Sequence, residues 1–234
     1  MQADQHTDAP YAVCFSGGKD SMLALDRARR SGVQVVRLVT LYDGPSERIR
    51  FHAVPVTVMR AQAEALGLPV SLYPTTPLTF EEVFVSALDT LRADGIHGLI
   101  FGNIHLADVR KWYEDRVRAA GLEHVEPLWS EAPERLVREV VSRGYRAVLT
   151  CTEESNTDPG WLGQPISEEL IAAFERRGID PCGEHGEYHT LVTNGPLFHV
   201  PLAVHFGAMH VDGDPHLGGR FRQLDIQLRG GESA

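Results

Sequence analysis

Apolar runs alternate with amphipathic segments along most of the chain. Val33–Leu41 is rich in β-branched residues, which is typical of a strand buried in a parallel sheet. Between such runs, apolar residues recur at helical spacing, as Phe84, Leu88 and Leu91 do. Strands are predicted at 11–15, 33–41, 70–73, 98–102 and 145–152, and helices at 22–28, 56–66, 80–91, 106–117, 136–141 and 166–177. The alternation predicts an α/β fold with a parallel sheet.

The pattern changes in the last third of the chain. Residues 198–204, 206–211 and 221–228 alternate between apolar and polar side chains, which predicts antiparallel strands with one solvated face. A turn-rich linker is expected at 213–219, between the last two of them. Residues 153–164 show no periodicity, and a loop of that length in a compact protein is usually functional or disordered.

Composition narrows the class of protein. The 234 residues carry 22 Lys and Arg against 32 Asp and Glu, a net charge of −10 that argues against broad binding to nucleic acid. There is no apolar run of membrane-spanning length, and residues 1–10 lack the features of a signal peptide, so we expect a cytoplasmic protein without a membrane partner. Cys14, Cys151 and Cys182 stand far apart, which suggests neither a disulfide framework nor a redox pair. Self-association into a homo-oligomer stays open.

The densest chemistry begins directly after the first predicted strand. Adjacent glycines in a strand-to-helix turn let the backbone N–H groups and the helix N-terminus bind an anion, here most naturally a phosphate. A carboxylate beside a polyphosphate would repel it unless a divalent cation lay between them, so Asp20 implies Mg²⁺. The turn consists of Ser16, Gly17, Gly18, Lys19, Asp20 and Ser21. The alternative is a plain glycine turn with Ser21 capping the helix.

This hexapeptide resembles the SGGxDS signature of the PP-loop ATP pyrophosphatases, and it lacks the spacing of a Walker loop. The resemblance implies that ATP is cut between its α and β phosphates. Two nearby positions are candidates for the nucleotide: Tyr42, at the end of the second strand, for adenine or ribose, and His52 in the loop that follows. For His52, a solvated loop histidine is the alternative.

Polar residues also follow the strand at 98–102. The carboxyl ends of parallel strands form the ligand-binding edge of such a sheet, so these residues could line a site with Gly102 against the nucleotide. The candidates are Asn103, His105, Asp108 and Arg110. An ordinary amphipathic helix with surface charges explains the same spacing.

A second dense motif spans residues 180–190, where glycines, carboxylates, histidines, a tyrosine and a thiol predict a site rather than a core. Cys182, His185 and His189 could bind zinc, but no fourth ligand stands nearby, which argues against it. The carboxylates Glu184 and Glu187 could hold a metal, ammonia or a cationic substrate group.

Taken together, these segments resemble the diphthine–ammonia ligase family of PP-loop enzymes. The resemblance rests on residues 16–21, 102–113, 127–129, 161–163 and 182–190, the last being similar to a Gly-Glu-x-Gly-Glu-Tyr-His-Thr signature. It implies a parallel-sheet HUP-type (adenine nucleotide α-hydrolase-like) nucleotide-binding domain at 1–126 and a smaller α+β substrate-side domain at 127–234. Where the family commonly has Asp, this chain has Asn103, which puts the family's substrate in doubt.

The same resemblance implies an enzyme that activates a carboxylate with ATP and Mg²⁺, releases pyrophosphate and transfers the acyl group to ammonia. Catalytic roles are expected for Asp20, Lys19, Glu184 and Glu187, with Asp20 as metal ligand. Substrate contacts are expected from Asn103, His105, Asp108, Arg110, Glu184, His185, Glu187, Tyr188, His189 and Thr190. Two alternatives keep the phosphate loop: a tRNA-thiolating enzyme, or a non-catalytic ATP- or AMP-binding module.

Overall fold

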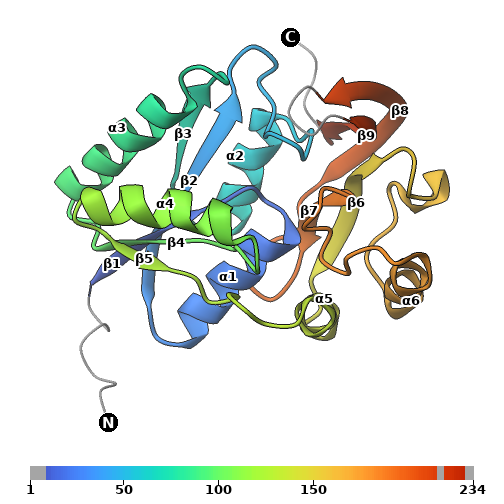
Figure 1. Cartoon of the computed structure of the whole chain (residues 1–234), viewed down its shortest axis with the longest axis horizontal. Helices are drawn as coiled ribbons and strands as arrows, with labels where there is room; N and C mark the ends of the chain where they lie inside the picture. The colour runs from blue at the N-terminus through green and yellow to red at the C-terminus, as the bar shows by residue number, and fades with distance from the viewer. Residues whose placement is uncertain (1–8, 215–218, 230–234) are drawn as a thin grey trace.

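The computed structural model describes residues 9–214 and 219–229, which contain two sheets (Figure 1). The first is a parallel sheet with the strand order β3-β2-β1-β4-β5. Its strands are β1 (Pro10–Cys14), β2 (Gln34–Asp43), β3 (Val70–Thr75), β4 (Gly98–Ile100) and β5 (Glu123–Val125). The chain order reverses between β1 and β4, and in such sheets ligands bind at the carboxyl ends of the strands that flank this switch point.

Helices cover both faces of the parallel sheet (Figure 1). They are α1 (Lys19–Arg30), α2 (Val56–Ala65), α3 (Phe80–Ala93) and α4 (Ala107–Ala119). Phe84 of α3 and Val117 of α4 are fully buried in one apolar cluster, while Met22 of α1 and Met59 of α2 are fully buried in the other. None of the helices in the described part of the chain has the length and apolar character needed to cross a bilayer.

The second sheet is antiparallel, with the strand order β7-β6-β9-β8. It consists of β6 (Arg146–Glu153), β7 (Tyr188–Asn194), β8 (Val204–Asp214) and β9 (Gly219–Leu228), and it is accompanied by α5 (Pro133–Ser142), α6 (Glu168–Arg177) and the short 3₁₀ helix η1 (Pro159–Trp161). Leu25 of α1, Leu136 of α5 and Leu149 of β6 belong to one buried cluster. The two halves therefore share a continuous core, which fixes how they face each other.

The structure confirms the expected fold class, a parallel α/β sheet followed by a smaller part with antiparallel strands. The prediction of a strand at 198–204 is wrong: pairing begins only at Val204, and Val200 is exposed. Residues 188–194 form β7, although no regular element was expected there. The short edge strand β5 was also missed. Of the expected linker, residues 215–218 lie outside the described residues.

Candidate functional site

The phosphate loop connects β1 to α1 at the switch point of the parallel sheet. Gly17 has a φ of +80°, which favours glycine, and Gly18 occupies the N-cap position of α1. A Cβ atom at Gly17 would lie 2.4 Å from Oε1 of Gln62, and one at Gly18 would lie 2.6 Å from Cε1 of His52. Ser21 Oγ donates to the carbonyl of Gly18 over 3.1 Å. Both glycines are thus required by the packing around the turn.

Gln62 holds the phosphate loop in place through hydrogen bonds to the backbone, and the sequence analysis did not identify this residue. Its side chain is fully buried, and its Nε2 donates to the carbonyl oxygens of Gly17 at 3.0 Å and Val192 at 2.7 Å. The amide of Val192 also donates to the Gly17 carbonyl at 2.9 Å. The sequence does contain a sign of this role, because Gln62 is a polar residue within the apolar face of α2.

Gly102 lets the end of β4 approach the start of α1. A Cβ atom there would lie 2.8 Å from the carbonyl carbon of Asp20 and 2.9 Å from the amide of Ser21. Any larger residue would displace the first turn of α1. Gly102 therefore supports the phosphate loop through backbone packing.

Lys19 joins the phosphate loop to the second motif. Its backbone N–H donates to Thr190 Oγ1 at 3.0 Å, and its side chain is only 3% exposed. The ammonium donates to Asp20 Oδ2 at 2.8 Å and to the carbonyl of Cys182, and it lies 4.9 Å from the centre of the Tyr188 ring. Burial opposes the charge of this ammonium, yet Asp20 and its other neighbours outweigh burial and raise the pKa of Lys19 above its ordinary value.

Carboxylates from both halves gather where these two segments meet. Burial, followed by the negative charge of Asp20, raises the pKa of Glu184 to about 8; Lys19 opposes the rise, and Asp180 and Glu187 add to it. The Asp20 side chain remains 24% exposed. This surplus of carboxylate oxygens fits a divalent cation such as Mg²⁺, which would relieve the repulsion between Asp20 and Glu184.

Glu187 is placed differently from Glu184. It is buried, and its two oxygens accept backbone N–H groups from Asp180 at 3.2 Å and from His185 at 3.1 Å. Glu187 therefore stabilises the loop before β7 through hydrogen bonds within that loop. The expectation that residues 180–190 have no core role is wrong for part of the motif, because Cys182 and Tyr188 are each 1% exposed and the Cys182 thiol donates to the carbonyl of Pro133.

Two histidines flank the phosphate loop. Nδ1 of His52 donates to the carbonyl of Thr190 at 2.9 Å, and the His52 and His189 rings lie 4.9 Å apart. Burial lowers the pKa of both side chains, His189 well below its ordinary value, so both rings are neutral at pH 7. Nε2 of His189 is buried and has no hydrogen-bond partner among the residues that the structure describes. Its unpaired state makes it a candidate contact for a ligand bound at this loop.

The residues predicted after β4 separate into two groups. Asn103 and Arg110 both bind Glu126: the Asn103 amide donates to Oε1 at 2.7 Å, and Arg110 Nε lies 2.7 Å from Oε2. An aspartate at position 103 would instead oppose this carboxylate. Asp108 is exposed in the first turn of α4. Among the described residues, no hydrogen bond or ion pair joins these three side chains to the second motif, whereas Nε2 of His105 lies 3.9 Å from Oδ2 of Asp180.

Tyr42, the candidate for adenine or ribose, lies one residue before the end of β2. It pairs with Pro74 of β3, and its carbonyl accepts a hydrogen bond from Thr75 Oγ1 at 2.8 Å. Its ring is half-buried against the main apolar cluster. The structure thus places Tyr42 at the ligand-binding edge of the sheet without joining it to the phosphate loop.

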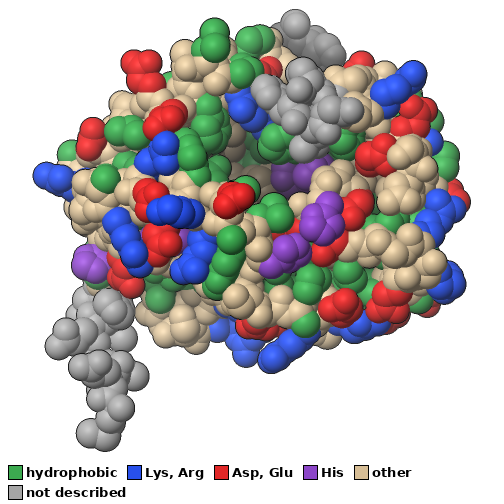
Figure 2. All heavy atoms as spheres, viewed as in Figure 1, with side chains coloured by type: hydrophobic (Ala, Val, Ile, Leu, Met, Phe, Trp, Pro, Cys, Tyr) green, Lys and Arg blue, Asp and Glu red, His purple; other side chains and the backbone are tan. Residues whose placement is uncertain are grey.

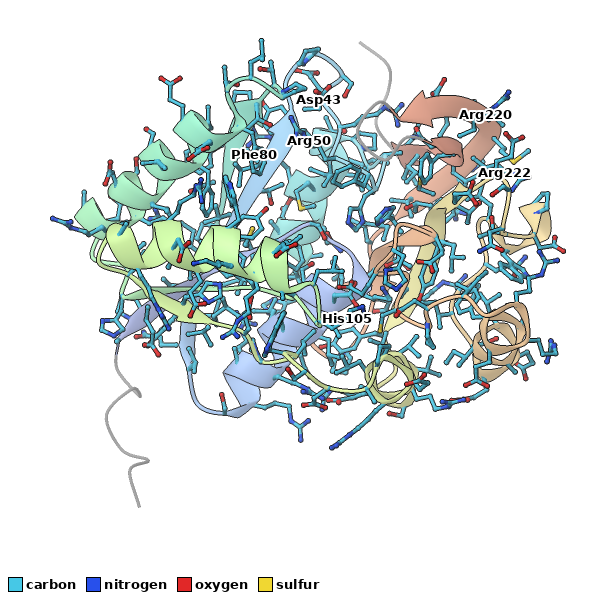
Figure 3. All side chains as sticks on the ribbon, viewed as in Figure 1. Asp43, Arg50, Phe80, His105, Arg220 and Arg222 are labelled. Carbon is cyan, nitrogen blue, oxygen red and sulfur yellow. The ribbon has the colours of Figure 1, made fainter. Side chains whose placement is uncertain are left out.

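Arg50 is a cation that the sequence reasoning missed. Its guanidinium lies 5.0 Å from the centre of the Phe80 ring, and its Nη2 is buried with no hydrogen-bond partner in the described residues (Figure 3). The surrounding loop is strained, since the non-glycine residues Glu47, Phe51 and Ala53 have positive φ angles. A half-buried cation with an unpartnered, buried nitrogen on a strained loop indicates a site for an anionic ligand.

A cavity of about 470 Å³ opens beside this loop. Its walls come from the loop after β2 and from β8 and β9, and they include Arg48, Arg50, Phe51, His210 and Gln223. Figure 2 shows a hollow between the two halves on the same face of the molecule, with histidines beside it. The volume suits part of a nucleotide or a small acid.

Comparison with known proteins agrees with the sequence pattern. Residues 10–124 match the family Diphthamide synthase N-terminal domain, and residues 132–214 match Diphthamide synthase C-terminal domain. The chain is 26% identical to diphthine–ammonia ligase of Homo sapiens and 24% identical to that of Bos taurus, covering 82% of this chain and 82% of each relative.

Two further similarities are partial. Identity to diphthine–ammonia ligase of Schizosaccharomyces pombe is 28% over 79% of this chain, which spans only 34% of that protein. The solved U34-tRNA thiolase NcsA of Methanococcus maripaludis aligns with a TM-score of 0.39 and 14% identity, covering 58% of this chain and 56% of the thiolase. A likeness at that level carries no argument about function.

Proposed function

The chain belongs to the diphthamide synthase family, and we propose that it is an ATP-dependent ligase that joins a carboxylate to ammonia through an acyl-adenylate. One observation carries the proposal. The phosphate loop and the motif at 180–190 meet through the bond from the Lys19 amide to Thr190, which brings Glu184 close enough for the charge of Asp20 to act on its carboxylate. This arrangement supports a site for ATP next to a site for a second reactant.

The first step forms the activated acid. An oxygen of the substrate carboxylate attacks the α-phosphorus of ATP, an O–P bond forms, the bond to the β-phosphate breaks and pyrophosphate leaves. The loop from Ser16 to Ser21 would hold the departing phosphates with its N–H groups and the positive end of α1. Mg²⁺, held by Asp20, would neutralise the charge of the phosphates. Arg50 would contribute a further positive charge.

The second step forms the amide. The nitrogen of ammonia attacks the acyl carbon, a C–N bond forms, the C–O bond to AMP breaks and one proton must leave the nitrogen. Glu184 is suited to accept it, because burial raises the pKa of its carboxyl group and so makes it a stronger base than an ordinary carboxylate. Glu187 would act through the loop that it closes.

The alternative of a tRNA-thiolating enzyme has less support than the ligase, because the cysteines are poorly suited to transfer sulfur. Burial raises the pKa of Cys14 to about 12 and that of Cys182 further, which keeps both thiols protonated at neutral pH. A thiol of this kind is a poor nucleophile. The thiolating alternative would require a sulfur carrier other than these residues.

The proposed bond cleavage gives a direct test. The purified protein is incubated with ATP labelled at the α-phosphate, Mg²⁺, ammonium and a panel of carboxylates that includes diphthine-bearing protein. We expect AMP and pyrophosphate, at a rate that depends on both ammonium and the acid. ADP and orthophosphate as main products would contradict the mechanism, and AMP formation that depends on a sulfur donor would favour the thiolating alternative.

A further inference from the structure

Three metal-binding side chains converge at the junction of the two halves. Nε2 of His105 lies 3.9 Å from Oδ2 of Asp180, and the ring centres of His105 and His185 lie 5.6 Å apart. One ligand atom from each of the three residues lies within 4.8 Å of the others. His105 follows β4 in the first half, and the other two belong to the loop before β7 in the second. Figure 3 shows His105 between the parallel sheet and the second sheet.

We propose that His105, Asp180 and His185 form a site for one divalent transition-metal ion, with zinc the best match to its ligands. Two imidazole nitrogens and one carboxylate oxygen are a set that Zn²⁺ accepts, with a remaining position left to water or substrate. Mg²⁺ prefers oxygen ligands alone, so this site is distinct from the one expected at Asp20. The inference does not rest on the proposed function.

The present spacing requires only small movements. Ligand atoms about 2 Å from a tetrahedral zinc ion lie about 3.3 Å from each other. The side chains of His105 and Asp180 are 32% and 10% exposed, and His185 is exposed, so at least two of the three can turn without disturbing the core. Side-chain rotation can therefore shorten the distances between the ligand atoms, now up to 4.8 Å, to about 3.3 Å without moving the backbone of either half.

Asp180 is already oriented for such a role. Its Oδ1 accepts the backbone N–H of Cys182 at 2.7 Å and that of Glu184 at 3.5 Å, which fixes the carboxylate and leaves Oδ2 toward His105. Outer contacts of this kind hold metal ligands in place. The same bonds connect the ion to Glu184, so metal binding would hold the loop that carries this carboxylate against the first half of the chain.

These three residues differ from the zinc set weighed from sequence. The Cys182 thiol is buried and donates to the carbonyl of Pro133, and the ring of His189 packs 4.9 Å from that of His52, so neither belongs to the group around His185. His105 and Asp180 take their places, from positions 80 and 5 residues before His185. The sequence pattern alone gave no reason to combine them.

Metal binding is measured on the full chain after removal of metals with a chelator. Co²⁺ serves as a spectroscopic probe, because imidazole–carboxylate coordination gives visible d–d absorption, and Zn²⁺ is then added to displace it. We expect saturable binding of one Co²⁺ per chain, displacement by Zn²⁺, no displacement by excess Mg²⁺, and a melting temperature several degrees higher with Zn²⁺.

Three variants decide which residues bind. His105→Ala and His185→Ala should each weaken Co²⁺ binding at least about tenfold and abolish the shift in melting temperature with Zn²⁺. His210→Ala is the matched control, since His210 forms a similar histidine–aspartate pair with Asp212 on β8, 3.4 Å apart, and is not part of the group of His105, Asp180 and His185. It should bind as the wild type does.

Any of three results would overturn the proposal. The first is that the wild type shows no saturable Co²⁺ binding, the second is that the His105 and His185 variants bind Co²⁺ with the affinity of the wild type, and the third is that the His210 variant loses as much affinity as they do. Because both histidines are solvent-accessible, their removal should leave the metal-free melting temperature within a few degrees of the wild type. If the wild type binds the metal but forms no AMP, the proposed ligase activity is contradicted and the proposed metal site is not. The two proposals can therefore fail separately.

Discussion

The backbone N–H of Lys19 donates a hydrogen bond to the hydroxyl of Thr190, which lies 171 positions later in the chain. The bond joins the first residue of α1 to the start of β7. Because both partners are buried, the contact is protected from water and worth more than a surface bond. It makes the phosphate loop and the second motif parts of one site, and the predictions below follow from that arrangement.

Asp20→Ala and Ser21→Ala should each lower the rate of ATP consumption by at least about a hundredfold, because contacts to metal or phosphate are lost. Ser31→Ala is the control, since Ser31 Oγ bonds to the carbonyl of Ala28 at the opposite end of the same helix. Steady-state kinetics and calorimetric ATP binding measure the effect. An unchanged ATP affinity in both loop variants would show that the loop does not bind the nucleotide.

Glu184→Gln and Glu187→Gln should have different consequences. The Glu184 variant should unfold at no lower temperature than the wild type and bind ATP within a few fold of it, yet lose amide formation at least about a hundredfold. The Glu187 variant presents an amide N–H₂ group to a backbone donor, so it should lose about 1–3 kcal/mol of stability together with its activity.

Thermal unfolding beside single-turnover assays of AMP and amide separates the two glutamates. If Glu184→Gln unfolds at a much lower temperature, or loses ATP binding and amide formation equally, then Glu184 is part of the scaffold. An unaltered melting temperature in Glu187→Gln would mean that its two hydrogen bonds contribute little.

Arg50→Ala should raise the KM for ATP or for the acid substrate by about 10–100-fold, since a charge-assisted contact to an anion would be lost. Its melting temperature should stay within a few degrees, because Nη2 of the guanidinium has no hydrogen-bond partner among the described residues that the substitution would leave unpaired. Arg37→Ala, which breaks a partly exposed ion pair with Asp94, is the control. Equal KM values in wild type and Arg50→Ala would remove Arg50 from the site.

Stability should fall as pH rises toward 8 on account of Glu184. Its pKa is raised in the folded state, so between its ordinary pKa and about 8 the folded protein holds a proton that the unfolded chain has released. Ionisation in this window therefore favours unfolding. Glu184→Gln removes the effect, and its melting temperature relative to the wild type should increase by a few degrees between pH 5 and pH 8.5. Glu64→Gln, on the exposed face of α2, should show no such trend.

Much of the fold follows from local patterns. Apart from the short edge strand β5, the order of strands and helices up to α6 can be predicted, because buried parallel strands and amphipathic helices each have a characteristic period. Ser167 illustrates the success of local rules, since its hydroxyl caps α6 by accepting the amide of Leu170. The strand β7 was missed because Tyr188 to Asn194 begins inside a motif whose polar residues suggested only a site.

The sequence by itself determined most of the element order and marked the phosphate loop and the second motif as candidate sites, since these depend on neighbouring residues. Only the tertiary structure decided which of the candidate side chains lie together. It separated Glu184, on which the charge of Asp20 acts, from Glu187, which binds its own loop, and it gave Asn103 and Arg110 to Glu126. It also identified Arg50 and the group of His105, Asp180 and His185 as candidates for ligand binding. Such pairings depend on packing between segments far apart in the chain, which no local period encodes.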